Sequence, residues 1–332
     1  MSHNNQARQP QPRDFEYISH FEAQALNLGT LTRLGENFPL GEGWYNLNLR
    51  FNNVVTIGTA TGAIAEGELN LIKNVAIKTS MGETICNLPG RALYRIAQYQ
   101  RGSAPRKDAN AAASGTYRVS LPINFADFRM LRPTDTILNT WRYSYITLEV
   151  TYGTVADLYT TVGTASMTAS IDVEIVRTRA RLPGKALPLF QINYDSFSPI
   201  DASVATQIRL QISRDLAYKR LYAFECSAGS AGVPFSGVPA DDVKATETIV
   251  GGTRTVAYKR IHEVIQDDNR MIYGLESPPA GFTVFDFVRD GSVNSALWSA
   301  EFPELLYQWT NKAGVAAADL VTLGYEAVRT LK

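Results

Sequence analysis

The chain has 332 residues, of which 45% are hydrophobic and 19% charged, with 24 glycines and 15 prolines. A chain of this composition can bury large cores, which excludes a disordered protein, and its length favours two domains over one. The 32 basic and 32 acidic residues balance to a formal net charge of zero, so direct, charge-driven binding of nucleic acid is not expected.

Residues 1–40 are predicted to form an N-terminal arm with one short amphipathic segment. The first dozen residues are polar and contain two prolines, which is typical of a mobile arm. The apolar residues that follow approximate one face of a short helix: Phe15, Ile18, Phe21, Ala25 and Leu28. This stripe docks either on the protein's own core or on a neighbouring molecule or lipid surface, so Phe15, Ile18 and Phe21 are candidate contact residues.

No apolar run reaches the roughly 18 to 20 residues that span a bilayer, and the N-terminus lacks the pattern of a signal peptide. The chain is therefore expected to be a soluble protein that is synthesised and assembled in the cytosol.

Alternation of apolar and polar residues predicts strands from residue 45 onward. The clearest example has Leu47, Leu49 and Phe51 on one face and polar residues on the other. Residues 68–78 alternate with a slip at Ile72 that suits a β-bulge. Residues 117–125 also alternate, and Pro122 on their polar face predicts a strand at the edge of a sheet.

Three features of the first half recur in the second half. Residues 167–180 align without a gap with 319–332, and their apolar residues alternate in the same phase. A short helix is predicted in each half from the apolar stripes Leu93, Ile96, Ala97 and Ile261, Val264, Ile265. An aromatic-led strand then follows each helix, beginning at Tyr117 and at Phe282. The sequence therefore predicts a duplicated domain.

Many strands, few helices and abundant turn residues predict an all-β protein of the sandwich or barrel class. Two prolines and a glycine between Ala180 and Phe190 break both helix and strand. The first domain is therefore predicted at 41–182, a linker at 183–190 and the second domain at 191–332. Two segments of small and polar residues, 102–115 and 227–242, are predicted to be exposed loops.

The sequence yields no candidate catalytic residue, metal site or cofactor, and the chain is not expected to be an enzyme. The histidines are far apart and form no HxH, HExxH or His–Cys cluster, which disfavours metal hydrolysis and a two-domain cupin: His3, His20 and His262. We expect His262 to be an ordinary, partly exposed histidine on the second helix. Asp241 and Asp242 lie in a loop, where nothing visible in the sequence perturbs their acidity.

Taken together, these elements resemble the double jelly-roll major capsid proteins of tailless icosahedral viruses, particularly bacteriophages with an internal membrane. The resemblance covers residues 41–332 and rests on the segments WYNLNLRF, ELNLIKNVAIKTSMGETICNLPGRAL and FTVFDFVRDGSVNSALW. It implies two tandem eight-stranded jelly-roll sandwiches, each with a short helix insertion.

The resemblance also implies a function in the virion shell. The chain would form pseudo-hexagonal homotrimers that tile an icosahedral capsid around an internal membrane. Its partners would be other copies of itself in the trimer and in neighbouring capsomers, penton and minor capsid proteins, and the membrane through the N-terminal region. In that family the termini face inward, so Phe15, Ile18 and Phe21 would be inner-face or inter-subunit contacts, and the long loops form outer towers.

Two functions from other classes remain open. A carbohydrate- or receptor-binding tandem β-sandwich protein would carry exposed aromatic residues on its loops, where the long loops offer only Phe235. A tandem-sandwich hydrolase acting on glycans would need paired acids in a cleft between the halves.

Overall fold

The structure is a computed structural model that describes residues 15–35, 38–108, 113–127, 129–178, 190–210, 215–230, 232–252 and 254–330, with the backbone alone for 254–258. The arm predicted for the first dozen residues lies outside the described residues, and so does the predicted linker 183–190 except for Phe190. No helix in the described ranges has both the length and the apolar character that crossing a membrane requires.

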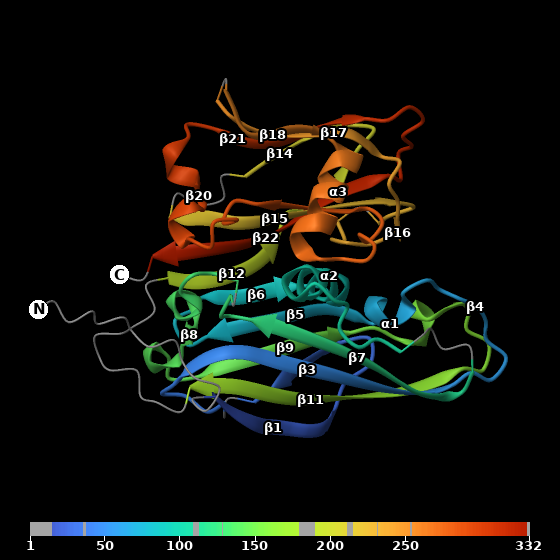
Figure 1. The fold of residues 1–332 in the computed structure, drawn as a ribbon. Coiled ribbons are helices and arrows are strands. Elements are labelled where there is room, and N and C mark those ends of the chain that lie inside the picture. Colours follow the sequence, from blue (N-terminus) through green and yellow to red (C-terminus); the bar gives the residue numbers. More distant parts are fainter. Residues whose placement is uncertain are drawn as a thin grey trace, which may run out of the picture.

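The first half consists of two antiparallel sheets that pack face to face, with one helix beside them (Figure 1). One sheet has the order β1-β11-β3-β7, formed by Phe15–Ala25, Ser166–Thr178, Gly43–Thr56 and Gly115–Asn124. The other has the order β2-β9-β5-β6, formed by Leu31–Leu34, Ile146–Tyr152, Ile72–Thr79 and Thr84–Leu88. Helix α2 (Gly90–Arg101) connects β6 to β7.

The second half repeats this arrangement. One sheet has the order β12-β22-β15-β19, formed by Phe190–Ser196, Leu320–Thr330, Leu216–Ser227 and Phe282–Asp286. The other has the order β14-β21-β17-β18, formed by Gln207–Arg209, Leu305–Asn311, Lys244–Gly251 and Arg254–Ile261. Helix α3 (His262–Tyr273) connects β18 to β19, as α2 connects β6 to β7.

Both halves therefore have the same topology. When the eight strands of the two main sheets in each half are counted along the chain, the sheets have the orders first-eighth-third-sixth and second-seventh-fourth-fifth. This is the strand order of a jelly roll. The all-β class, the two tandem eight-stranded jelly rolls and the helix in each half are confirmed, and β11 and β22 are the repeated closing strands.

Short elements decorate the loops. The short strands are β4 (Thr61–Ala63), β8 (Leu138–Asn139), β10 (Tyr159–Thr161), β13 (Ile200–Asp201), β16 (Val238–Pro239) and β20 (Leu297–Trp298). The helical turns are α1 (Gly67–Asn70), η2 (Pro133–Thr136), η3 (Thr140–Arg142), η4 (Val155–Asp157), η5 (Val293–Ser295) and η6 (Ser299–Glu301).

The two jelly rolls are joined by backbone pairing and by a shared apolar core. Strand β12 pairs in parallel with β6 at Tyr194 and Cys86, so a sheet of the first half continues into a sheet of the second. Tyr99 of α2 stacks on Phe282 of β19 with 5.7 Å between ring centroids, and its hydroxyl donates a hydrogen bond of 3.0 Å to the Phe282 carbonyl. The largest buried cluster contains residues of both halves, so the molecule is one packed block.

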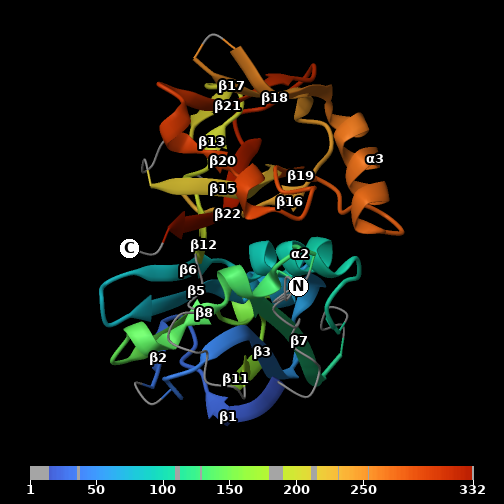
Figure 2. The same cartoon turned by 60° about the vertical axis from the view of Figure 1, so that its left-hand side comes forward.

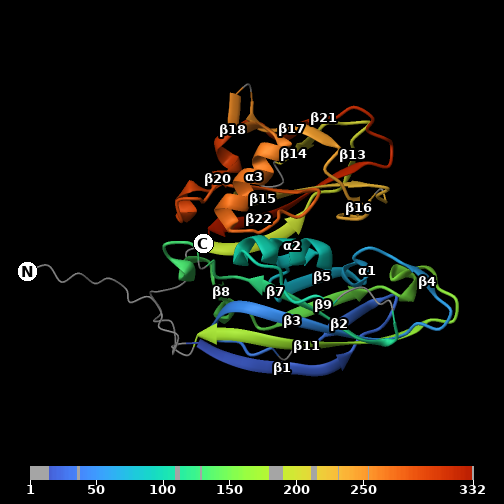
Figure 3. The same cartoon turned by 45° about the vertical axis from the view of Figure 1, so that its right-hand side comes forward.

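The axes of the long strands in both halves are roughly parallel to one another (Figures 1 and 3). The described chain begins and ends at the same end of these strands (Figure 1). Phe15 pairs with Thr178, and Phe190 pairs with Thr330. The two-stranded sheet of β4 and β10 and the loop that carries β16 lie at the opposite end (Figure 1). Figure 2, turned by 60°, shows one jelly roll stacked on the other. Helix α2 lies between the two jelly rolls, and α3 lies beside the second jelly roll on the same side of the molecule (Figure 2).

The structure corrects the helix predicted for the N-terminal segment. Residues Phe15–Ala25 form strand β1, which pairs with β11 and has register shifts between Ser19 and Phe21 and between Phe21 and Gln24. Each shift inserts an odd number of residues into the two-residue period of a strand. The first shift therefore lets Ile18 and Phe21, three residues apart, share one face as they would in a helix. Phe15 and Ile18 have no shift between them and lie on opposite faces of the strand.

Other predictions on elements have mixed outcomes. Strand β7, which contains Pro122, lies at a sheet edge as predicted, because proline cannot donate to a neighbouring strand. A register shift follows Ile72 as predicted, but the residues before it form the helical turn α1. Of the stripe predicted for the second helix, Ile265 is buried as expected, but Ile261 precedes α3 and is 53% exposed, and Val264 is 44% exposed. The buried face of the helix consists of His262, Ile265, Asn269 and Tyr273.

Candidate functional site

The three candidate contact residues lie on β1, an edge strand of the first jelly roll. Phe15 packs edge-on against Tyr45 with 4.4 Å between ring centroids. Phe21 packs against Phe38 at 5.6 Å and adjoins the main core, and Ile18 is half-buried. The structure therefore shows contacts of Phe15 and Phe21 with their own domain. Their contact with a neighbouring subunit or a membrane stays a prediction.

The free edge of β1 is distorted in a way that limits open-ended strand pairing. Within the described residues β1 pairs only with β11. In addition to the two register shifts of β1, the backbone of Ala23 has a φ of 50°, and its N–H donates a hydrogen bond to Asp172 Oδ1 at 2.8 Å. Bulges and irregular backbone at a sheet edge discourage uncontrolled addition of further strands. The edge is therefore suited to a side-chain contact rather than to sheet extension.

An open groove of about 840 Å³ covers the outer face of the β1-β11-β3-β7 sheet. Its lining is polar and includes carboxylates that already have partners: Asp172 and Glu174 accept hydrogen bonds from Asn52 and Asn48 at 3.0 and 2.7 Å. The groove has the character of a wet protein surface rather than that of an apolar ligand pocket.

A fully buried charge network joins the two jelly rolls. Asp127 follows β7 of the first half, and its Oδ2 lies 3.0 Å from Lys219 Nζ and 2.7 Å from an Arg220 nitrogen. Both basic residues also contact Glu326 of β22, at 2.5 Å for Lys219 Nζ and 3.1 Å for Arg220. Arg220 Nε further donates to Asp286 at 3.0 Å. Five charged side chains from both halves thus form one buried network of ion pairs.

A β-bulge in β15 explains how two consecutive residues reach the same network. Consecutive side chains of a regular strand point to opposite faces. The pairing of β15 with β22 shifts register between Tyr218 and Arg220, so Lys219 is the inserted residue. Because a bulge re-aims one side chain, Lys219 and Arg220 both reach Glu326.

The network holds its acids in the ionised state. Burial alone would raise the pKa of Asp127, but the charges of Lys219 and Arg220 hold it well below its usual value. The same two cations lower the pKa of Glu326 against the effect of burial. Acids that stay ionised at neutral pH cannot donate a proton as general acids. The arrangement is that of a structural clamp.

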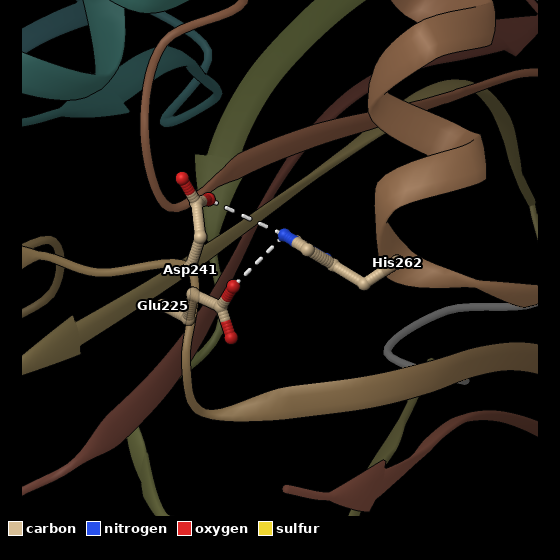
Figure 4. Close-up of side chains that lie close together, drawn as sticks. All are labelled: Glu225, Asp241 and His262. Atoms are coloured by element: carbon tan, nitrogen blue, oxygen red, sulfur yellow. Dashed lines mark hydrogen bonds and ion pairs between the residues drawn. The ribbon is translucent and has the colours of Figure 1, made fainter.

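A second buried polar cluster surrounds His262 at the start of α3 (Figure 4). The ring is fully buried; its Nδ1 lies 2.7 Å from Glu247 Oε1, and its Nε2 lies 2.9 Å from Glu225 Oε1 and 3.4 Å from Asp241 Oδ1. Strand pairing creates this proximity, because β18 pairs with β17 with Ile261 opposite Thr246. The helix then begins with His262 beside Glu247.

The charges around His262 perturb both the histidine and its partner. Burial alone would lower the pKa of His262, but the carboxylates of Asp241, Glu225 and Glu247 raise it to about 10. Burial would raise the pKa of Glu247, but Lys244 and His262 lower it to about 2. Lys244 Nζ lies 3.0 Å from Glu247 Oε2 and Tyr307 donates to the same oxygen at 2.5 Å. The cluster is tightly ordered.

The prediction of a partly exposed His262 is therefore wrong. The sequence showed nothing that would perturb Asp241. In the structure, burial alone would raise the pKa of Asp241, but hydrogen bonds from His262, the Gly281 backbone and Gln266 lower it. The sequence separates Glu225, Asp241, Glu247 and His262 by loops and a hairpin, so no short motif signals their meeting. The available signal was the mixed polarity of the β15 sequence, LAYKRLYAFECS, in which every residue but the last is buried, its three charged residues included.

Comparison with known proteins gives a match in structure alone. No protein-family model matches the chain, and no curated protein matches its sequence. Among solved structures, the major capsid protein of Sulfolobus turreted icosahedral virus matches with a TM-score of 0.67 at 17% identity, covering 95% of this chain and 97% of that chain. The chain has the double jelly-roll fold.

Two further double jelly-roll structures match over nearly the whole chain. The major capsid protein P2 of bacteriophage PM2 matches with a TM-score of 0.61 at 10% identity, covering 96% of this chain and 98% of that chain. The Faustovirus major capsid protein matches with a TM-score of 0.58 at 8% identity, covering 96% and 90%. The similarity is one of fold, and it extends through both jelly rolls and the junction between them.

Proposed function

We propose that this protein is the major capsid protein of an icosahedral virus and that its working unit is a homotrimer. The observation that carries the proposal is the pair of jelly rolls with one strand order, joined side by side into a single block. Three such chains around an axis present six similar sectors, and a six-sectored block can tile a facet with nearly equivalent contacts. The structural neighbours named as major capsid proteins share this architecture from end to end.

The two ends of the block suggest its orientation in the shell. The described chain begins and ends at one end of the strands, and the β4–β10 sheet and the β16 loop lie at the other (Figure 1). In our proposal the end with the termini faces an internal membrane, where residues 1–14 and strand β1 contact lipid or a neighbouring subunit. The loop end faces outward, and penton and minor capsid proteins complete the shell.

The alternatives find less support. Phe235, the aromatic residue of the long loops, is 2% exposed and stacks on Phe224, with 5.4 Å between ring centroids. It offers no platform for a sugar ring, which weakens the carbohydrate-binding reading. For a glycan hydrolase, the paired acids at the junction of the halves are fully ion-paired with Lys219 and Arg220. A role without catalysis therefore fits the site better.

The first test is the native mass of the purified protein by light scattering, with negative-stain imaging of the same sample. We expect particles of three chains with a hexagonal outline. A stable monomer at micromolar concentration would contradict the proposal, and a glycan array would then test the binding-protein alternative.

The inner-face role is tested by deleting residues 2–14. A deletion of 2–28 is unsuitable because it removes strand β1 and its pairing with β11. We expect the shorter deletion to leave trimers intact but to reduce their flotation with phosphatidylglycerol vesicles and their assembly into shell fragments. Unchanged flotation and unchanged assembly would remove the N-terminal residues from the inner face.

A further inference from the structure

The buried cluster around His262 has the composition of a metal site. One imidazole nitrogen and two carboxylate oxygens, from His262, Glu225 and Asp241, lie within 4.8 Å of one another. The three side chains converge from helix α3, strand β15 and the loop before β17 (Figure 4). Ligand atoms about 2.0–2.2 Å from a zinc ion are roughly 3–4 Å apart. The distance of 3.4 Å from Nε2 to Asp241 matches that spacing, and the distance of 2.9 Å to Glu225 is slightly shorter.

The other side of the imidazole carries the support that metal-binding histidines have. Nδ1 lies 2.7 Å from Glu247 Oε1, and Glu247 is fixed in turn by Lys244, Tyr307 and Thr283. A carboxylate that accepts the Nδ1 proton sets the tautomer, orients the ring and leaves Nε2 as the ligand atom.

One ligand oxygen in the cluster has an unused lone pair. Glu225 is fully buried, and its Oε2 accepts the Lys244 backbone N–H at 2.7 Å. Among the described residues no donor makes a hydrogen bond to its Oε1, although His262 Nε2 lies 2.9 Å away outside hydrogen-bond geometry. A buried carboxylate oxygen without a hydrogen bond is costly unless a cation completes its shell.

The carboxylate of Asp241, the second candidate ligand, is fixed by hydrogen bonds. Its Oδ1 accepts hydrogen bonds from the Gly281 backbone N–H and the Gln266 side chain, each at 2.6 Å. Its side chain is 43% exposed, so the cluster opens to solvent on this side and a water can supply a fourth ligand.

The charge of the cluster also favours a divalent ion. Three carboxylates and Lys244 leave two negative charges around a neutral imidazole. A divalent cation brings the cluster to neutrality, whereas a proton on the ring leaves one negative charge on the cluster, which the partly exposed Asp241 shares with solvent.

We propose that His262 Nε2, Glu225 and Asp241 bind a divalent transition-metal ion of the zinc type, with Glu247 as the positioning residue for the imidazole. Imidazole together with carboxylates suits zinc and cobalt, whereas an all-oxygen set suits calcium and magnesium. On binding, the Nε2 proton leaves to solvent and the metal takes its place. The ion would fasten the loop that ends at Asp241 to helix α3 and strand β15. This site is independent of the proposed capsid role.

The test uses the full-length protein, stripped with EDTA and dialysed against Zn²⁺, Co²⁺ or Ca²⁺, with bound metal measured by mass spectrometry. We expect one Zn²⁺ or Co²⁺ per chain and no stoichiometric Ca²⁺. X-ray absorption of the zinc-loaded protein should show one imidazole and oxygen ligands near 2.0 Å. Absence of stoichiometric zinc, or a bound zinc without imidazole, would overturn the proposal.

Two variants complete the test. Asp241→Asn should lower zinc affinity at least tenfold, and since its side chain is partly exposed and the amide oxygen still accepts from Gly281, the fold is preserved. Glu263→Gln removes a neighbouring exposed carboxylate, paired with Lys312 at 2.6 Å, and should bind zinc like the parent. Equal affinity of the parent and Asp241→Asn would contradict the assignment, and circular dichroism checks that both variants fold.

Discussion

At the scale of single residues, the environment of His262 determines the charge of an otherwise ordinary side chain. Its three carboxylate partners raise its pKa from 6.5 to about 10. In the metal-free protein the folded state therefore keeps a proton that the unfolded state loses near neutral pH. The histidine's contribution to stability is complete below pH 6.5 and is lost as the pH rises toward 10.

This gives a prediction for stability against pH. Between pH 6.5 and 9, in the presence of EDTA, the free energy of unfolding should fall by about 3 kcal/mol more in the parent than in His262→Gln, because one pH unit per proton corresponds to about 1.4 kcal/mol. Urea denaturation at several pH values measures both proteins. Parallel pH profiles for the two would show that His262 is not protonated in the fold.

Sequence alone could predict which face of a regular strand is buried, but not these polar contacts. Alternation placed Leu47, Leu49 and Phe51 in the core, where all three are buried. The partners of Lys219, by contrast, are 92 and 107 residues away, and their meeting depends on a bulge that no local pattern announces. Long-range polar contacts require the register of strands, which one sequence does not fix.

At the scale of elements, periodicity succeeded wherever the strand was regular. The closing strands β11 and β22 were predictable from uninterrupted alternation. Strand β1 was not, because its register shifts broke the period. The stripe predicted for α3 included Ile261, which is the last residue of β18. The strands of the second half were harder to see because β15 and β19 are buried on both faces and show no alternation.

The contact between α2 and β5 offers a test at this scale. A Cβ at Gly90, the first residue of α2, would lie 2.5 Å from Ile72 Cβ, closer than packed carbon atoms can approach. Gly90→Ala should therefore lower the free energy of unfolding by about 1–3 kcal/mol through overpacking. Gly115→Ala is the matched control, since its Cβ would meet only the Tyr117 ring at 3.8 Å, and chemical denaturation should find it unchanged. Equal stability of the two variants would refute the close contact.

At the scale of the whole molecule, the junction of the jelly rolls is the decisive feature. Duplication was visible in the sequence, but the mode of joining was not. Glu174 and Glu326 occupy matching positions in the repeated strand, yet Glu174 is half-buried beside Asn48 while Glu326 is fully buried among charges. The difference arises because the first jelly roll covers that face of the second, whereas the corresponding face of the first is an open groove in the described part of the chain.

Removing one cation tests the clamp at this junction. Lys219→Met roughly keeps the length of the side chain but leaves Asp127, Glu326 and Asp286 with Arg220 as their one ion-pair partner among the described residues. We expect a loss of about 3–5 kcal/mol in the free energy of unfolding. Lys78→Met removes a half-exposed lysine 2.7 Å from Glu149 and should cost no more than about 1 kcal/mol. Similar losses in both variants, measured by chemical denaturation, would mean that the junction adds no special stability.

The sheet that passes from β6 into β12 has a mechanical consequence. A hinge needs a region where few bonds cross, but here backbone pairing, stacked rings and the buried ion pairs of Asp127 with Lys219 and Arg220 all cross the junction. Each chain should therefore respond to mechanical load as one rigid body, in which the two jelly rolls do not move relative to each other. In a closed shell built of such subunits, bending at facet edges and swelling under internal pressure would be accommodated by the contacts between trimers.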